Sequence, residues 1–127
     1  MSTNSNNKVA FIGLGVMGYP MAGYLQQKGY QVTVYNRTAA KAEKWAAQYG
    51  GAYAETPAKA AQGATLVFLC VGNDNDVRSV VYGEQGVLAG MASGSVLIDH
   101  TTASANLARE LAQAAKQQGI GFLDAPV

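Results

Sequence analysis

A run of glycines, Gly13-Leu14-Gly15-Val16-Met17-Gly18, constrains the fold of this chain more than any other feature of its sequence. It follows a short apolar run at residues 9–12 and opens a segment in which apolar residues have helical spacing. Glycines so placed permit a tight turn, let the backbone approach a pyrophosphate closely, and bring a helix against a strand. The N–H groups at the start of that helix attract phosphate. The pattern therefore predicts a dinucleotide-binding loop, and the alternative is a strand-to-helix turn without a ligand.

The rest of the sequence alternates short apolar, β-branched runs with alanine-rich segments. The runs lack polar alternation, which is typical of strands buried on both faces of a parallel sheet. Strands and helices at this spacing predict right-handed crossovers. We therefore expect a single doubly wound α/β domain of the Rossmann type, with helices on both faces and strand order 3-2-1-4-5-6. The expected strands are residues 9–12, 32–35, 66–71, 96–98 and 121–123, with 51–53 as a weaker candidate.

Apolar stripes and end-forming residues indicate the helices. Met17 and Met21 are interpreted as helix packing, and Gly29 as the residue that follows that helix. Thr38 and Thr56 are expected to be N-caps of later helices. The clearest stripe consists of Leu107, Ala108, Leu111, Ala112 and Ala115.

Composition excludes several classes of function. The chain has 127 residues and a net charge of +1, and 13% of its residues are charged, so it offers no basic field for nucleic acid or an anionic membrane. One cysteine and one histidine form neither an internal disulfide nor a zinc cage, so no metal site is expected. No apolar run approaches the length of about 18 residues needed to span a bilayer. Residues 1–7 are polar, so we expect a disordered leader, no signal peptide, and a cytoplasmic protein.

The residues after the second expected strand indicate which dinucleotide binds. NAD-binding domains usually place a carboxylate there to accept a hydrogen bond from the ribose 2′-hydroxyl. This chain has Asn36-Arg37-Thr38 instead. A guanidinium binds a 2′-phosphate through paired, charge-assisted hydrogen bonds, whereas a carboxylate repels it. We therefore predict NADP(H) as cofactor, bound by Asn36, Arg37 and Thr38. The alternative is that Arg37 is simply solvated and Thr38 is only a cap.

The end of the fourth expected strand is a second candidate for cofactor contact. In an open α/β sheet, ligands lie beyond the carboxyl ends of the strands, where the strand order reverses. Val71 and Gly72 follow that strand, and glycine allows close approach of a ligand. The alternative is an ordinary turn that caps the next helix. Cys70 is interpreted as a core residue, because a buried thiol behaves as a small hydrophobe.

The end of the fifth expected strand offers hydroxyl groups. Thr102 is the favoured contact for the nicotinamide ribose or carboxamide, and Thr101 is a weaker second choice. Either could equally be a helix cap. His100 is interpreted as structural, because the sequence shows no positioned partner for a general acid–base.

Taken together, these motifs resemble the β-hydroxyacid dehydrogenase family, which includes 3-hydroxyisobutyrate dehydrogenases. The resemblance implies hydride transfer between NADPH and a small β-hydroxyacid or semialdehyde substrate, with Thr102 at the cofactor and a homo-oligomeric enzyme. It spans nearly the whole chain from Lys8. It is carried by FIGLGVMGYPMA at 11–22, VYNRT at 34–38, DHTT at 99–102 and GFLDAPV at 121–127.

The resemblance also implies which residues are not here. In the family, the proton-donating lysine and the helical domain follow a motif whose beginning matches residues 124–127 of this sequence. Both would therefore lie beyond Val127. We therefore expect residues 8–127 to be a dinucleotide-binding domain, cut before the helical catalytic domain and inactive alone. It contains no catalytic residue by this argument, and it exposes apolar surface that favours self-association. Two alternatives remain: a non-catalytic NADPH-binding or sensing module, and the cofactor domain of an imine reductase.

Overall fold

A six-stranded parallel sheet forms the centre of the molecule, in the order β3-β2-β1-β4-β5-β6. The computed structural model describes residues 7–102 and 104–126, so all of the expected leader at residues 1–7 except Asn7 lies outside the described residues. The observed order and the parallel pairing confirm the doubly wound topology. The strands are β1 (Lys8–Ile12), β2 (Gln31–Tyr35), β3 (Ala52–Tyr53), β4 (Leu66–Leu69), β5 (Val96–Asp99) and β6 (Gly121–Asp124).

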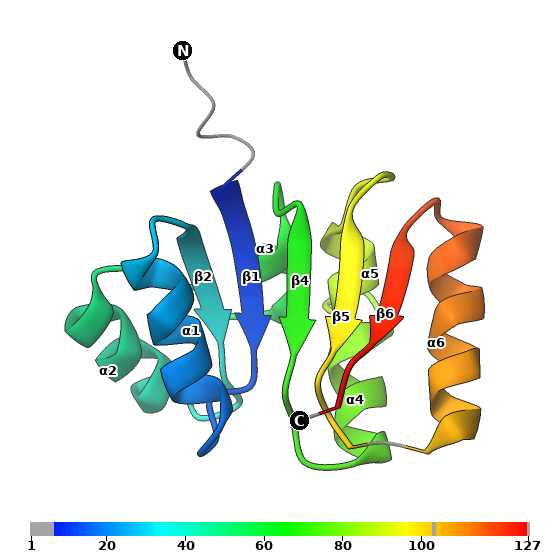
Figure 1. The fold of residues 1–127 in the computed structure, drawn as a ribbon, viewed down its shortest axis with the longest axis horizontal. Helices are drawn as coiled ribbons and strands as arrows, with labels where there is room; N and C mark the ends of the chain where they lie inside the picture. Colours follow the sequence, from blue (N-terminus) through cyan, green and yellow to red (C-terminus); the bar gives the residue numbers. More distant parts are fainter. Residues whose placement is uncertain (1–6, 103, 127) are drawn as a thin grey trace.

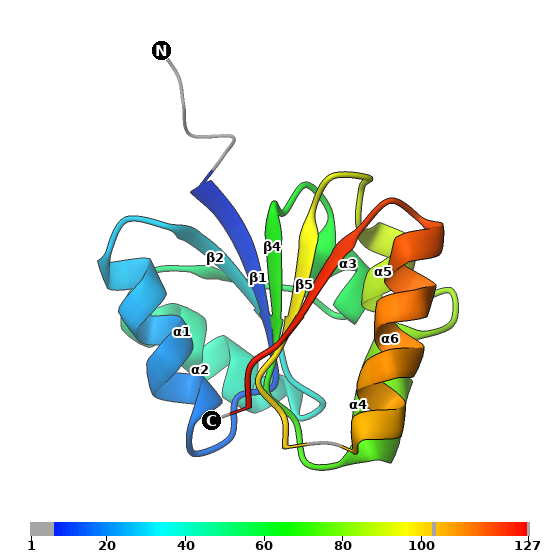
Figure 2. The same cartoon turned by 45° about the vertical axis from the view of Figure 1, so that its right-hand side comes forward.

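Helices cover both faces of the sheet, as expected. Two of them lie on one face over β1 and β2, and the others lie on the opposite face (Figures 1 and 2). The face that carries two helices over β1 and β2 has no helix over β4, β5 and β6 among the residues that the structure describes. None of the described helices has the length and hydropathy needed to cross a membrane. The helices are α1 (Gly18–Gln27), α2 (Ala39–Tyr49), α3 (Pro57–Ala61), α4 (Asp74–Val81), α5 (Val87–Gly90) and α6 (Ala105–Gln117).

Each face of the sheet has its own core. On the α1–α2 face, Phe11 and Trp45 are fully buried together with Val32 and Val34. On the other face, the expected stripe of α6 packs against the sheet. Three residues of that stripe have no more than a trace of exposed surface: Leu107, Leu111 and Ala115. The two cores place α1 and α4 on opposite faces of the sheet. The first turns of both helices border a cleft at the carboxyl ends of the strands.

Two expectations about burial are wrong. Strand β6 is not buried on both faces: Leu123 is 54% exposed, because β6 is an edge strand and the α1–α2 face has no described helix above it. The Met17 side chain does not pack in α1 and is 52% exposed. Helix α1 instead packs through small residues, and a Cβ at Gly23 would overlap the Tyr49 ring. Met21 is half-buried and packs as expected.

The helix ends follow the expected chemistry with one exception. Thr56 Oγ1 accepts a hydrogen bond from the Lys59 N–H at 3.1 Å, and Pro57 is the first residue of α3. Thr38 precedes α2 with extended backbone, but its side chain makes no capping hydrogen bond. Gly29 follows α1 with a φ of 104°, a backbone conformation that glycine adopts without strain.

A pair of leucine truncations tests where the core lies. We expect Leu111→Ala to lower the free energy of unfolding by about 2–5 kcal/mol, because it opens a cavity under a fully buried side chain. The same truncation at the exposed Leu123 is expected to cost about 1 kcal/mol or less. Urea denaturation followed by circular dichroism measures both, and equal losses would contradict the assigned core.

Candidate functional site

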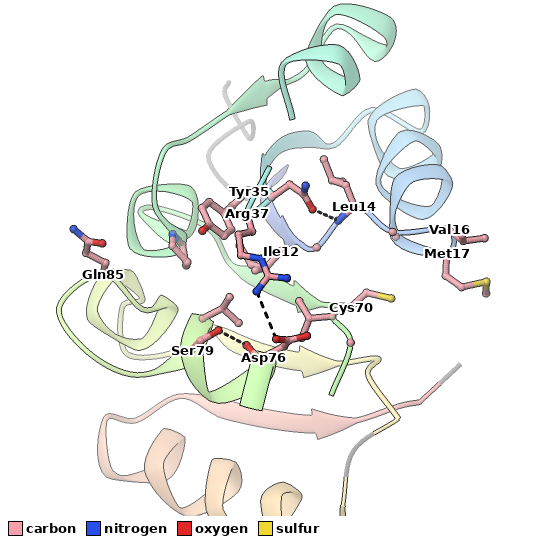
Figure 3. Close-up of a pocket in the computed structure, with 18 residues that line it drawn as sticks. Ile12, Leu14, Val16, Met17, Tyr35, Arg37, Cys70, Asp76, Ser79 and Gln85 are labelled. Atoms are coloured by element: carbon pink, nitrogen blue, oxygen red, sulfur yellow. Dashed lines mark hydrogen bonds and ion pairs between the residues drawn. The ribbon is translucent and has the colours of Figure 1, made fainter. Parts of the chain in front are cut away.

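A cavity of about 710 Å³ opens at the carboxyl ends of β1, β2 and β4. Strands β1 and β4 are neighbours in the sheet, although the chain leaves β1 toward β2, so this is the point where strand order reverses. The cavity lies between the glycine loop, the end of β2 and the first turns of α4 (Figure 3). All but two of the predicted site residues line it: Gly13, Leu14, Gly15, Val16, Met17, Gly18, Asn36, Arg37, Val71 and Gly72.

The glycines of the loop serve different steric purposes. Gly13 has a φ of 103°, and a Cβ there would overlap the Cys70 carbonyl oxygen of the neighbouring strand end. A Cβ at Gly18 would overlap the Gly13 carbonyl oxygen, so these two glycines are required by the fold. Gly15 differs, because a Cβ there would meet nothing within 4 Å. Its position faces open space, where a ligand could approach the backbone closely.

Free backbone donors gather at the same loop. The Tyr19 N–H donates to the Gly15 carbonyl at 3.0 Å, so the first helical turn already begins at Gly15. Within the part of the chain that the structure describes, no hydrogen bond engages the N–H groups of Gly15, Val16 and Met17. Figure 3 shows the Val16 and Met17 side chains pointing away from the opposite wall of the cavity, and Val16 is 92% exposed. The loop therefore offers unpaired donors at a helix start, the arrangement that binds phosphate.

Asn36 fastens the loop to the end of β2. Its side-chain oxygen accepts a hydrogen bond from the Leu14 N–H at 2.9 Å, and its amide nitrogen donates to the Thr38 carbonyl at 3.1 Å. One amide N–H of Asn36 is left for a ligand. From the sequence, Asn36 was expected to bind the cofactor, and its positioning role was not predicted.

Arg37 reaches across the cavity toward α4. Its Nη1 lies 3.9 Å from Oδ1 of Asp76, and the Arg37 side chain is 87% exposed whereas that of Asp76 is 32% exposed. Figure 3 shows the two side chains pointing toward one another from opposite walls. Asp76 was not predicted, because nothing in its sequence context separates it from an ordinary acidic residue in the first turn of a helix.

The end of β4 is both a cavity wall and a helix cap. Val71 and Gly72 line the cavity, and their contact with a cofactor stays a prediction. Asn73 Oδ1 accepts from the Asp76 N–H at 2.9 Å, so the turn also caps α4. Cys70 packs against the α1–α2 core and borders the cavity. Burial and then the Asp99 carboxylate raise the pKa of the Cys70 thiol, which keeps it neutral at pH 7.

The end of β5 holds the site together rather than lining it. Thr101 is buried, and its Oγ1 accepts from the Val71 N–H at 3.0 Å. The Asp99 carboxylate accepts from the Thr101 N–H at 2.9 Å, and burial raises the pKa of Asp99 despite that bond. Thr102 is exposed and is not among the residues that line the cavity, so its cofactor contact stays a prediction. Thr38 also lies outside the lining.

The His100 side chain has structural partners. Its Nδ1 lies 2.7 Å from the Ala125 carbonyl oxygen, and its ring stacks on Phe68 with 5.8 Å between centroids. These contacts join the ends of β5 and β6 and agree with the structural interpretation. The described residues contain no group of three or more His, Cys, Asp or Glu side chains placed to hold a metal ion.

Known proteins resemble this chain along nearly its full length. Residues 8–127 match the family model described as the NAD binding domain of 6-phosphogluconate dehydrogenase. An uncharacterised oxidoreductase of Shewanella frigidimarina is 62% identical over 120 residues, which cover 94% of this chain and 41% of that protein. Among solved structures, 3-hydroxyisobutyrate dehydrogenase of Mycobacterium tuberculosis is 32% identical with a TM-score of 0.85, over 95% of this chain and 40% of that one.

An imine reductase is similar to the same degree. The enzyme of Myxococcus stipitatus in complex with NADP+ is 32% identical with a TM-score of 0.82, over 92% of this chain and 39% of that one. The chain therefore spans about 40% of the length of these relatives.

Substitutions at Asn36 test how the loop is held. We expect Asn36→Ala to lower the free energy of unfolding by about 1–3 kcal/mol, because it leaves the buried Leu14 N–H without its acceptor. Asn36→Asp keeps an acceptor at that position and serves as the matched control. Amide hydrogen exchange of Leu14 should be faster in the alanine variant and protected in the aspartate variant. Equal protection in both variants would show that Asn36 does not hold the loop.

Proposed function

Because the chain belongs to the family of the NAD binding domain of 6-phosphogluconate dehydrogenase, we propose that its cleft binds NADP(H) in preference to NAD(H). The observation that carries this proposal is the position of Arg37 at the cavity, directly after β2. The residue before it is Asn36, not a carboxylate, so no negative charge at these two positions repels a 2′-phosphate. The exposed guanidinium supplies the charge-assisted donors that a phosphate needs.

The residues present fit a dinucleotide in shape and in hydrogen-bonding capacity. The open space beside Gly15 and the free N–H groups of Gly15, Val16 and Met17 suit a pyrophosphate. Val71 and Gly72 would flank the cofactor beyond β4. The hydroxyl contacts predicted for Thr38 and Thr102, which do not line the cavity, remain part of the proposal. When bound, a nicotinamide cofactor supplies the hydride, and the protein supplies binding and orientation.

We further propose that the chain is the cofactor domain of an oxidoreductase acting on a small β-hydroxyacid or its semialdehyde. The similarity to 3-hydroxyisobutyrate dehydrogenase supports this substrate class. The comparable similarity to an imine reductase keeps imines as the second candidate. No residue of this chain is proposed as the proton donor. Asp99 and His100, the titratable residues at the end of β5, are engaged in structural hydrogen bonds.

Self-association and a cytoplasmic location complete the proposal. The sheet face over β4, β5 and β6 exposes Leu123 and carries no described helix, so apolar surface is available for association.

A non-catalytic NADPH-binding module would share the cleft, and it would differ in showing no hydride transfer. Assays of the whole proposed oxidoreductase with semialdehyde and imine substrates distinguish these functions, since only an enzyme oxidises NADPH in the presence of its substrate.

Titration with both reduced cofactors tests the proposed preference. We expect wild type to bind NADPH more tightly than NADH, and Arg37→Ala to weaken NADPH binding by about ten-fold or more, because charge-assisted bonds to the 2′-phosphate are lost. NADH affinity should change little. Arg109→Ala, which removes the same charge from the exposed surface of α6, is the control. Calorimetry measures the affinity of all three proteins for both cofactors, and equal or tighter NADH binding by wild type overturns the proposal.

A single methyl group at Gly15 separates binding from folding. We expect Gly15→Ala to unfold at the same temperature as wild type, because its Cβ meets nothing within 4 Å and its φ is not positive. It should weaken NADPH and NADH alike by about ten-fold or more, since the methyl group occupies the space of the pyrophosphate. Thermal unfolding and calorimetry on the same sample decide the outcome. Undiminished binding by the folded variant would place the phosphates elsewhere.

A further inference from the structure

A pair of opposite charges, Arg37 and Asp76, spans the cavity. Arg37 and Asp76 approach each other to 3.9 Å from opposite walls, one after β2 and the other in the first turn of α4 (Figure 3). Both residues line the cavity. A ligand phosphate that uses the Arg37 guanidinium therefore enters a position where a carboxylate already faces that guanidinium.

Asp76 is held in place better than its partner. Its N–H donates to the Asn73 side chain at 2.9 Å, and the Ser79 hydroxyl donates to its carbonyl at 2.7 Å. A Cβ at Gly72 would lie 2.6 Å from Asp76 Oδ2, so the carboxylate rests against the bare backbone at the end of β4. The position in the first turn of α4 also stabilises a negative charge. The backbone of Asp76 is thus held in the first turn of α4 and its carboxylate packs at the end of β4, whereas the Arg37 side chain is 87% exposed.

We propose that Asp76 is a specificity-determining residue, whose carboxylate competes with the cofactor's 2′-phosphate for Arg37 and so reduces the preference for NADP(H) over NAD(H). This inference rests on the proposed function. A 2′-phosphate that binds the guanidinium through two parallel N–H bonds competes with Asp76 for the N–H donors of Arg37. NAD(H) carries a hydroxyl there, makes no such demand, and leaves the pair intact.

The size of the effect follows from the weakness of the pair. An exposed ion pair at this separation contributes little, because solvent screens both charges. A phosphate therefore displaces Asp76 readily, and removing the carboxylate gains about two- to five-fold in affinity. The gain should shrink at high ionic strength, because salt screens the competing charges.

Asp76→Asn tests the inference, with Asp74→Asn as the matched control. Both substitutions remove one negative charge from the first turn of α4. Asp74, however, accepts a hydrogen bond from the Ser104 N–H at 3.0 Å and is not among the cavity-lining residues. Calorimetry is performed with NADPH and NADH, and with 2′,5′-ADP and 5′-AMP as the minimal ligands that differ in the 2′-phosphate. Thermal unfolding of each variant verifies that α4 and the fold are intact.

The expected result is that Asp76→Asn binds NADPH and 2′,5′-ADP about two- to five-fold more tightly, with NADH and 5′-AMP unchanged. Asp74→Asn should match wild type with all four ligands. In an Arg37→Ala background, Asp76→Asn should lose most of its effect, because there is no guanidinium to compete for. An equal gain from Asp74→Asn would show a general field effect and overturn the inference.

Other outcomes overturn it as well. If Asp76→Asn weakens NADPH and NADH together, the carboxylate is a direct ligand of the part that both cofactors share. If Asp76→Asn changes nothing while wild type binds NADPH, the competition does not exist, although the proposed function stands. If wild type binds none of the four ligands, the proposed function itself fails. The behaviour of wild type therefore separates the two failures.

Discussion

The close packing of the glycine loop against the end of β4 is the constraint on which the rest of the site depends. Gly13 lies so near the Cys70 carbonyl that no side chain fits, and its N–H donates to the Tyr35 carbonyl at 2.9 Å. The loop that follows β1 is thereby held against the ends of both neighbouring strands, β2 and β4. From this position, α1 begins with its free N–H groups over the carboxyl edge of the sheet. The parallel topology brings Arg37 and Gly72 to the same edge, because parallel strands end on one side of a sheet.

Side chains that a sequence reading assigns to the ligand also hold this geometry. Asn36 binds the Leu14 N–H, and Thr101 binds the Val71 N–H, so each of these polar groups fixes a backbone segment that lines the cavity. Thr101 bridges the ends of β4 and β5, whereas its neighbour Thr102 is exposed and turned to solvent. A cleft formed by several loops needs such cross-links, because loops have few apolar contacts of their own.

The fold was predictable from local patterns, whereas parts of the site were not. The alternation of strands and helices, the glycine loop and the caps depend on neighbouring residues, so periodicity and turn chemistry find them. The exposure of Leu123 depends on which strand lies at the sheet edge and on what covers it, and an apolar run does not carry that information. Met17 was misread because α1 packs through glycine and alanine, which contribute nothing to an apolar stripe. Asp76 was missed because its partner, Arg37, is distant in sequence.

In the proposed function, affinity for the cofactor and discrimination between the two dinucleotides are carried by different chemical groups. The candidate phosphate donors are backbone N–H groups, fixed by glycines whose replacement would disturb the fold. The groups that we propose to distinguish a 2′-phosphate from a hydroxyl are side chains at the cavity, of which Arg37 is largely exposed and is not part of either core. We therefore expect a substitution at Arg37 or Asp76 to change the charge at the proposed ribose position and to leave the loop geometry unchanged. Such a separation would allow one scaffold to accommodate either dinucleotide, because folding would fix the proposed pyrophosphate site and a few replaceable charges would set the ribose site.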